Sequence, residues 1–72
     1  MITNSLKVER VRKNLTQAEL ARQIGVSRQT IHAIEKNKYI PSTELALKLS
    51  AFLGISVNEL FRLQAELQSK VA

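Results

Sequence analysis

Two adjacent polar side chains, Arg28 and Gln29, carry the most specific chemistry that the sequence suggests. An arginine can donate two hydrogen bonds to O6 and N7 of guanine, and a glutamine can pair in the same two-pronged way with N7 and N6 of adenine. Both residues fall in the first turn of an expected helix, which would fit a DNA major groove about 12 Å wide. The alternative is an exposed helix turn chosen for solubility, and we favour base recognition.

Neighbouring residues extend this candidate surface. We expect further contacts with base edges from Ser27, His32 and Ala33, of which Ala33 offers only an apolar contact, such as one with a thymine methyl. His32 is the only histidine, so we expect a base, phosphate or solvent contact for it rather than a metal site. The residues expected to hold DNA phosphates are Gln17, Thr30, Lys36, Asn37, Lys38 and Tyr39. A solvated charged loop is the alternative for the last four.

Positive charge is concentrated in the N-terminal half of the chain. The formal net charge is +5, and eight basic and three acidic residues precede Tyr39, whereas three of each follow it. A polyanion-binding face requires such an excess of basic side chains. Ordinary solubilising charge is the alternative, so the asymmetry supports nucleic-acid binding only in combination with the residues above.

The composition argues against several other classes of protein. The 72 residues include one histidine and no cysteine, which excludes disulfides and thiolate metal sites, and neither a glycine-rich phosphate loop nor a distinctive pair of carboxylates indicates an enzyme. We therefore expect no cofactor, no metal and no small-molecule effector. Apolar runs are too short to cross a bilayer, and residues 1–7 lack a signal-peptide core, so a soluble cytoplasmic protein is expected.

Helical spacing and capping residues predict five helices in one domain spanning residues 1–72. A first helix is expected over residues 5–14, capped by Asn4 or Ser5, after a short extended arm at residues 1–3. Its apolar residues at helical spacing are Leu6, Val8, Val11 and Leu15. A domain this small buries only about 60% of the surface that its unfolded chain exposes, so dimerisation would help to stabilise it.

Hydroxyl residues cap the later helices, and two of them form capping boxes with a glutamate three residues further on. The expected caps are Thr16 with Glu19, Ser27, Ser42 or Thr43, and Ser56 with Glu59. Gly25 and Gly54 end the second and fourth helices because glycine adopts positive φ at little cost, and the fifth helix is expected over residues 57–69. The expected buried residues are Leu20, Ala21, Ile24, Ile31, Ile34, Leu45, Ala46, Leu49, Leu53, Leu60 and Phe61.

Residues 17–36 have the pattern of a helix-turn-helix. This motif needs a short stiff turn, a small residue where two helices cross, and apolar residues that fix the angle of the second helix. Ala21 is the small residue, Gly25 makes the turn, and Val26 is the apolar residue after it. Ile31 and Ile34 then fix the second helix, which presents Arg28 and Gln29 outward.

The sequence resembles the Cro and phage-repressor (XRE-type) helix-turn-helix family in the segments QAELARQIGVSRQTIHAIEKNKYIPS and ELALKLSAFLGISVNELF. Its RQTI and NKYIPS segments are most similar to small stand-alone regulators of the cytolysin-operon repressor type. The resemblance implies an all-α, five-helix, lambda-repressor-like fold that binds operator DNA as a homodimer. It also implies that Arg28 and Gln29 contact the DNA, and that Arg10 and Glu35 form a structural ion pair between the first and third helices. Phage repressors often have a longer side chain at the position of Ala33.

The end of the chain carries more apolar residues than a small core needs. Leu63, Leu67 and Val71 continue the stripe of the fifth helix past the core, and we expect them to pair across a two-fold axis, together with Ile2. The favoured function is a homodimeric regulator, acting as a repressor on an inverted-repeat operator in double-stranded DNA. The alternative is an antitoxin or adaptor that uses the same fold mainly to bind a protein.

Overall fold

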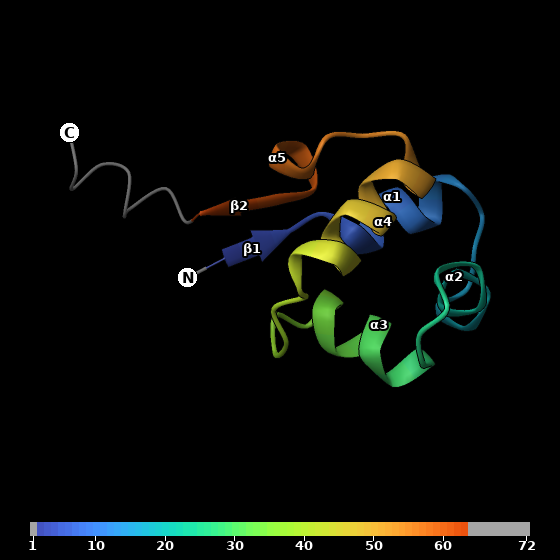
Figure 1. Ribbon diagram of the computed structural model, residues 1–72. Helices are drawn as coiled ribbons and strands as arrows, with labels where there is room; N and C mark the ends of the chain where they lie inside the picture. The colour runs from blue at the N-terminus through green and yellow to red at the C-terminus, as the bar shows by residue number, and fades with distance from the viewer. Residues whose placement is uncertain (1, 64–72) are drawn as a thin grey trace, which may run out of the picture.

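Five short helices and a two-stranded sheet make up the fold, and the computed structural model describes residues 2–63. The elements are β1 (Ile2–Asn4), α1 (Leu6–Arg12), α2 (Gln17–Ile24), α3 (Arg28–Glu35), α4 (Thr43–Leu53), α5 (Val57–Leu60) and β2 (Phe61–Leu63). Figure 1 shows α3 along the lower edge, with α1 and α4 above it and the strands extending to one side. The predicted five-helix fold with a helix-turn-helix is confirmed, and the expected N-terminal arm is β1. None of the helices within residues 2–63 is long and apolar enough to cross a membrane.

The predicted caps begin the helices. The Thr16 hydroxyl accepts a hydrogen bond from the Glu19 N–H (3.0 Å), and the Glu19 carboxylate accepts one from the Thr16 N–H (2.8 Å). Single caps at Ser27 and Ser42 and the second box at Ser56 are also present. At the start of α1, Ser5 occupies the cap position without a side-chain cap bond. Instead, Oδ1 of Asn4 accepts a hydrogen bond from the Leu6 N–H (3.0 Å).

The core is formed by one buried stripe from each helix. The buried residues are Leu6, Leu20, Ala21, Ile24, Ile31, Ile34, Leu45, Leu49, Leu53 and Leu60, while Ala46 and Phe61 are half-buried. In α1 the spacing predicted the helix but not its inner face, because Val8 and Val11 are each 54% exposed. Val8 lies two residues, or about 200°, around the helix from Leu6, so Leu6 and Arg10 share the inward face instead.

The fifth helix is shorter than the sequence predicted. The prediction of a helix over 57–69 is wrong for residues 61–63, because α5 ends at Leu60 and these residues form β2. The strand β2 pairs antiparallel with β1, with Ile2 opposite Leu63 and Asn4 opposite Phe61. Residues 64–69 lie outside the described part of the chain. The fold is therefore mostly helical rather than all-α. The spacing of Phe61 and Leu63 fits both a helical stripe and the alternation of a strand. Pairing with β1, which is far away in sequence, makes this segment a strand.

Candidate nucleic-acid interface

The helix α3 presents its predicted reading residues to the outside. Ser27, Arg28 and Gln29 are exposed at its start, and Ala33 is half-buried one turn later. Ile31 and Ile34 on the opposite face are fully buried, so packing fixes the orientation of the helix. Among residues 2–63, neither Arg28 nor Gln29 makes a salt bridge or a side-chain hydrogen bond, which leaves both side chains free to reach a ligand.

Two hydroxyls at the start of α3 are engaged with each other. Oγ of Ser27 lies 2.9 Å from Oγ1 of Thr30 and also accepts a hydrogen bond from the Thr30 N–H at 3.1 Å. Ser27 therefore serves first as the helix cap. Each hydroxyl retains further hydrogen-bonding capacity, so the positions expected to contact a base edge and a phosphate are held rigid without being saturated.

Arg10 and Glu35 form an ion pair between α1 and the end of α3. Nε of Arg10 lies 2.7 Å from Oε2 of Glu35 and Nη2 lies 3.3 Å from Oε1, and only 11% and 4% of the two side chains are exposed. Nη1 of Arg10 also donates to the carbonyl oxygen of Leu15 (2.6 Å). A buried two-pronged pair restricts geometry more than it stabilises, since desolvation offsets much of its attraction. It fixes the end of α3 against α1.

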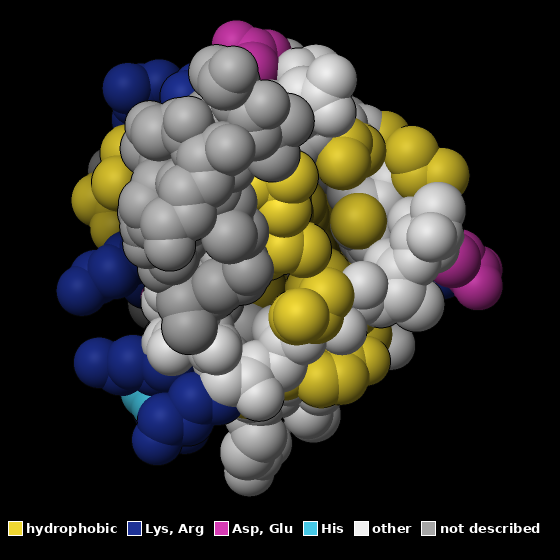
Figure 2. Space-filling model, turned by 90° about the vertical axis from the view of Figure 1, so that its left-hand side faces the viewer, with side chains coloured by type: hydrophobic (Ala, Val, Ile, Leu, Met, Phe, Trp, Pro, Cys, Tyr) yellow, Lys and Arg dark blue, Asp and Glu magenta, His cyan; other side chains and the backbone are white. Residues whose placement is uncertain are grey.

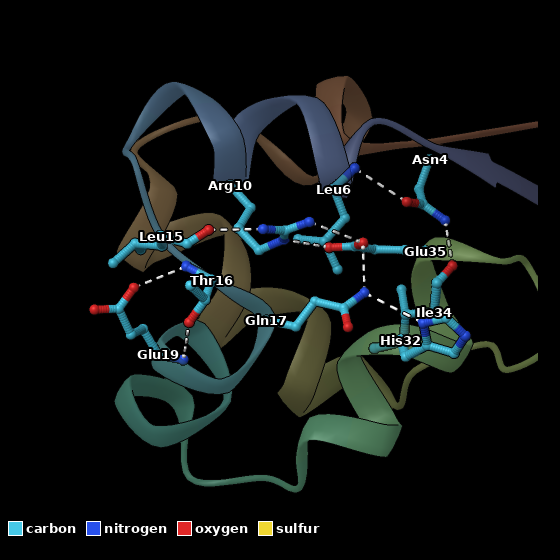
Figure 3. A network of polar contacts seen from close by, with 10 residues as sticks. All are labelled: Asn4, Leu6, Arg10, Leu15, Thr16, Gln17, Glu19, His32, Ile34 and Glu35. Atoms are coloured by element: carbon cyan, nitrogen blue, oxygen red, sulfur yellow. Dashed lines mark hydrogen bonds and ion pairs between the residues drawn. The ribbon is translucent and has the colours of Figure 1, made fainter.

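Gln17 and the exposed His32 extend this network, which Figure 3 shows from close by. Nε2 of Gln17 donates to Oε1 of Glu35 (3.0 Å) and lies 3.3 Å from Nδ1 of His32. Because a carboxylate can only accept, the amide nitrogen must face Glu35, and it then serves as the donor to Nδ1 of His32. The imidazole proton therefore belongs on Nε2. The amide donors of Gln17, expected to contact a phosphate, are therefore directed toward Glu35 and His32.

The turn after α3 is held by the first strand. Nδ2 of Asn4 donates to the carbonyl oxygen of Ile34 (2.8 Å) and to Oδ1 of Asn37 (2.9 Å). Asn37 has φ of 59°, a left-handed conformation that asparagine tolerates better than most residues. The sequence suggested Asn4 only as a helix cap, and its position before α1 carries no signal of this distant contact. Lys36, Lys38 and Tyr39 are all exposed around this turn.

The expected dimer residues fall partly within the described chain. Ile2 is half-buried and is the strand partner of Leu63 in the same chain, while Leu63 is 56% exposed; Leu67 and Val71 lie outside the described residues. Beside this strand pair is an apolar groove lined by Ile2, Ile40, Pro41, Thr43, Ala46, Leu47, Val57 and Phe61. Figure 2 shows hydrophobic side chains gathered on this face, and basic side chains with the single histidine along a neighbouring edge.

Ionisable groups in residues 2–63 do not assemble into a metal site, because no three metal-ligating side chains lie together there. One carboxyl group has a perturbed pKa: the Thr16 backbone N–H and then its hydroxyl hold the pKa of Glu19 below its ordinary value. This group is a helix cap at the surface.

Relatives with similar sequences are regulators of transcription. The helix-turn-helix family matches residues 6–60. An uncharacterized HTH-type transcriptional regulator of Methanocaldococcus jannaschii is 53% identical over 58 residues, which cover 81% of this chain and 88% of the relative. A cryptic phage CTXphi transcriptional repressor from Vibrio cholerae is 37% identical over 60 residues, which cover 83% of this chain and 54% of that repressor.

A solved structure agrees with these sequence relatives. A Bacteroides fragilis protein, described as a candidate DNA-binding protein, matches with a TM-score of 0.77 and 32% identity, covering 86% of this chain and 100% of that one. The family match spans both helices of the motif and the core around them. The chain therefore belongs to the Cro/C1-type (XRE) helix-turn-helix family, whose members here are DNA-binding transcriptional regulators and not enzymes.

Proposed function

We propose that residues 1–72 form a single helix-turn-helix domain that represses transcription in the cytoplasm by occupying an inverted-repeat operator as a homodimer. The observation that carries this proposal is the pair Arg28 and Gln29, exposed and unpaired within residues 2–63 at the start of a rigidly held α3. The similarity to a phage repressor supports repression as the output. Two such helices would enter successive major grooves about 34 Å apart.

The residues around α3 divide into two proposed roles. Arg28 and Gln29 read bases, with Ser27, His32 and Ala33 beside them on the exposed side of the helix. The proposed phosphate contacts, which fix the register of the protein on DNA without reading sequence, are Gln17, Thr30, Lys36, Asn37, Lys38 and Tyr39. For Gln17 we assign this contact to the backbone N–H groups at the start of α2, because its amide donors face Glu35 and His32.

The homodimer is proposed to form on the apolar side of the molecule, through Ile2, Leu63, Leu67 and Val71. Its support is the exposed hydrophobic surface there: Ile40, Leu47 and Leu63 are 65%, 55% and 56% exposed. A contiguous apolar surface of this kind marks an interaction site more often than isolated exposed residues do. A two-fold axis at this surface would make the same patch meet itself on both protomers.

Selection of bound fragments from a pool of random duplex DNA tests the proposal. We expect an enriched palindrome whose half-sites are separated by about one helical turn, since dimer symmetry is reflected in the operator. Enrichment of a single asymmetric half-site would contradict the homodimer. Failure of the protein to enrich any sequence would contradict sequence-specific binding as a whole.

The apolar groove favours one second function, that of an antitoxin or adaptor whose main ligand is a protein. Residues such as Ile40 and Leu47 are the anchors that a protein partner would bury. The two functions differ in their response to salt, because DNA binding releases counterions and weakens steeply as the salt concentration rises. A weak affinity for duplex DNA that barely responds to salt would favour the protein-binding function.

A further inference from the structure

A second polar surface, the basic pocket, lies between α1, the start of α2 and α3. Its rim includes Lys7, Arg28, His32 and Lys36. Arg28 and His32 lie four residues apart on one face of α3, and Lys36 follows four residues later as its C-cap. Lys7 reaches the same pocket from α1. Lys7 lies outside residues 17–36, so the helix-turn-helix pattern gives no information about its role.

Three of the basic side chains that line this pocket have no ion-pair partner among residues 2–63. Within residues 2–63, the salt bridges join Arg10 to Glu35, Arg12 to Glu9 and Lys48 to Glu44. Lys7, Arg28 and Lys36 are exposed and take no part in them. Three cations around one hollow create a positive potential that attracts an anion.

Among residues 2–63, Glu35 is the only acidic group that lines the pocket, and its carboxylate is already paired. Glu35 receives hydrogen bonds from Arg10 at 2.7 and 3.3 Å and from Gln17 at 3.0 Å, and 4% of its side chain is exposed. Its carboxylate oxygens thus face donors inside the protein rather than the pocket opening. The proton of His32 belongs on Nε2, because Nδ1 accepts from Gln17. The imidazole therefore offers a donor, and not an acceptor, to a ligand.

We propose that the basic pocket binds one backbone phosphate of duplex DNA, with Lys7 contributing a contact from outside the helix-turn-helix. The inference rests on the proposed function, because it presumes that α3 lies in the major groove. A phosphate at the edge of that groove would meet Lys36 at the end of α3 and the ammonium group of Lys7 from α1. It would also take the Nε2 donor of His32, which this inference assigns to the phosphate instead of a base edge. The phosphate would then bridge α1 and α3 on the outside, as the Arg10–Glu35 pair joins them inside.

Salt dependence of DNA binding tests the role of Lys7. Each neutralised phosphate contributes about −0.9 to the slope of log K against log salt for B-DNA. Because each protomer of the proposed dimer loses one contact, Lys7→Gln should reduce the magnitude of the slope by about two and weaken binding about 60-fold at 0.1 M salt, on operator and unrelated duplexes alike. Lys13→Gln is the matched control, since Lys13 is an exposed lysine at the other end of α1 that does not line the pocket.

An unchanged slope for Lys7→Gln, in a variant whose thermal unfolding matches the wild type, would overturn the inference while leaving the proposed function intact. Absence of salt-dependent duplex binding by the wild-type protein would instead overturn the proposed function. A duplex scanned with neutral methylphosphonate linkages locates the contact. At the linkage that Lys7 contacts in each half-site, the wild type should lose more affinity than Lys7→Gln does. Losses of equal size in both proteins at every linkage would contradict a phosphate held by Lys7.

Titration with inorganic phosphate, followed by NMR at Lys7 and His32, distinguishes a DNA phosphate from a small free anion. We expect no saturable shift at millimolar phosphate, because a single anion lacks the other backbone contacts that position the duplex. Saturable binding of inorganic phosphate combined with an unchanged DNA slope would assign the pocket to a small anion, and the proposal would be wrong.

Discussion

The two sides of the molecule use opposite chemistry. The polar network of Arg10, Gln17, His32 and Glu35 joins α1, α2 and α3 through hydrogen bonds of defined direction. The apolar groove that includes Ile2 and Leu47 has exposed apolar side chains, and within residues 2–63 no side chain that lines it makes a hydrogen bond. Directional contacts fix the angle of a helix, whereas apolar surface favours association without choosing a precise geometry. Under the proposed function, one side would set the geometry of DNA reading and the other would supply affinity between protomers.

The largest expected effect comes from breaking the polar network. Arg10→Met leaves the Glu35 carboxylate buried without its cation, and we expect the free energy of unfolding to fall by about 3 to 5 kcal/mol. Urea denaturation measures this change. Arg12→Met is the matched control, since Arg12 on the same helix pairs with Glu9 at the surface, where 71% of the arginine side chain is exposed, and such pairs contribute about 0 to 1 kcal/mol.

A domain this small can unfold completely when Arg10 is replaced alone. The double variant Arg10→Met with Glu35→Met removes both charges, and we expect it to recover most of the lost stability because no unpaired buried charge remains. Equal losses for the single and double variants would mean that packing around Arg10, rather than the ion pair, holds α1 and α3 together.

The next effect separates the two proposed roles on the DNA face. Arg28→Ala should weaken operator binding by about 1 to 3 kcal/mol and relax the preference at one base pair, whereas Lys38→Ala should weaken binding to every duplex alike. Competition assays with single-base operator variants measure both changes. The role assignment would be wrong if the two substitutions had the same sequence-independent effect.

On the apolar side, a charge at Leu63 should disrupt association without unfolding the protomer. Leu63→Asp is expected to raise the dimer dissociation constant at least tenfold, which corresponds to about 1.4 kcal/mol, because a carboxylate would be placed within an apolar contact. Sedimentation equilibrium gives the constant. Val8→Asp introduces the same charge at a valine that is 54% exposed on α1 and does not line the groove, and it should leave the dimer unchanged.

The smallest effect concerns the cap of α2. Hydrogen bonds from Thr16 keep the pKa of Glu19 lowered in the folded state, so the resulting stabilisation is present above the unfolded-state pKa. It is lost as the pH falls through the lowered folded-state value. Thermal unfolding of Glu19→Gln and of the wild type across this acidic range should therefore converge at the lowest pH. A constant difference between them would argue against this capping role for the carboxylate.

Features that depend on neighbours in sequence could be predicted. Thr16 with Glu19, the turn at Gly25 and the inward spacing of Ile31 and Ile34 each involve residues within a few positions of one another, and the helix-turn-helix follows from them. Features that depend on distant partners could not. Whether Phe61 continues a helix or begins a strand depends on Asn4, and the pocket that includes Lys7 exists only once α1 has packed beside α3.

Asn4 ties the strand pair to the carboxyl end of the reading helix. Its side chain contacts Ile34 and Asn37 while its backbone belongs to β1, which pairs with the strand that carries Leu63. If a second protomer displaced the β1–β2 pair, the hydrogen bonds of Asn4 would transmit the movement to the end of α3. Thermodynamic linkage makes any such influence mutual. An operator that prefers one tilt of α3 would select the matching arrangement of protomers. The dimer would in turn discriminate among operators by the spacing of their half-sites.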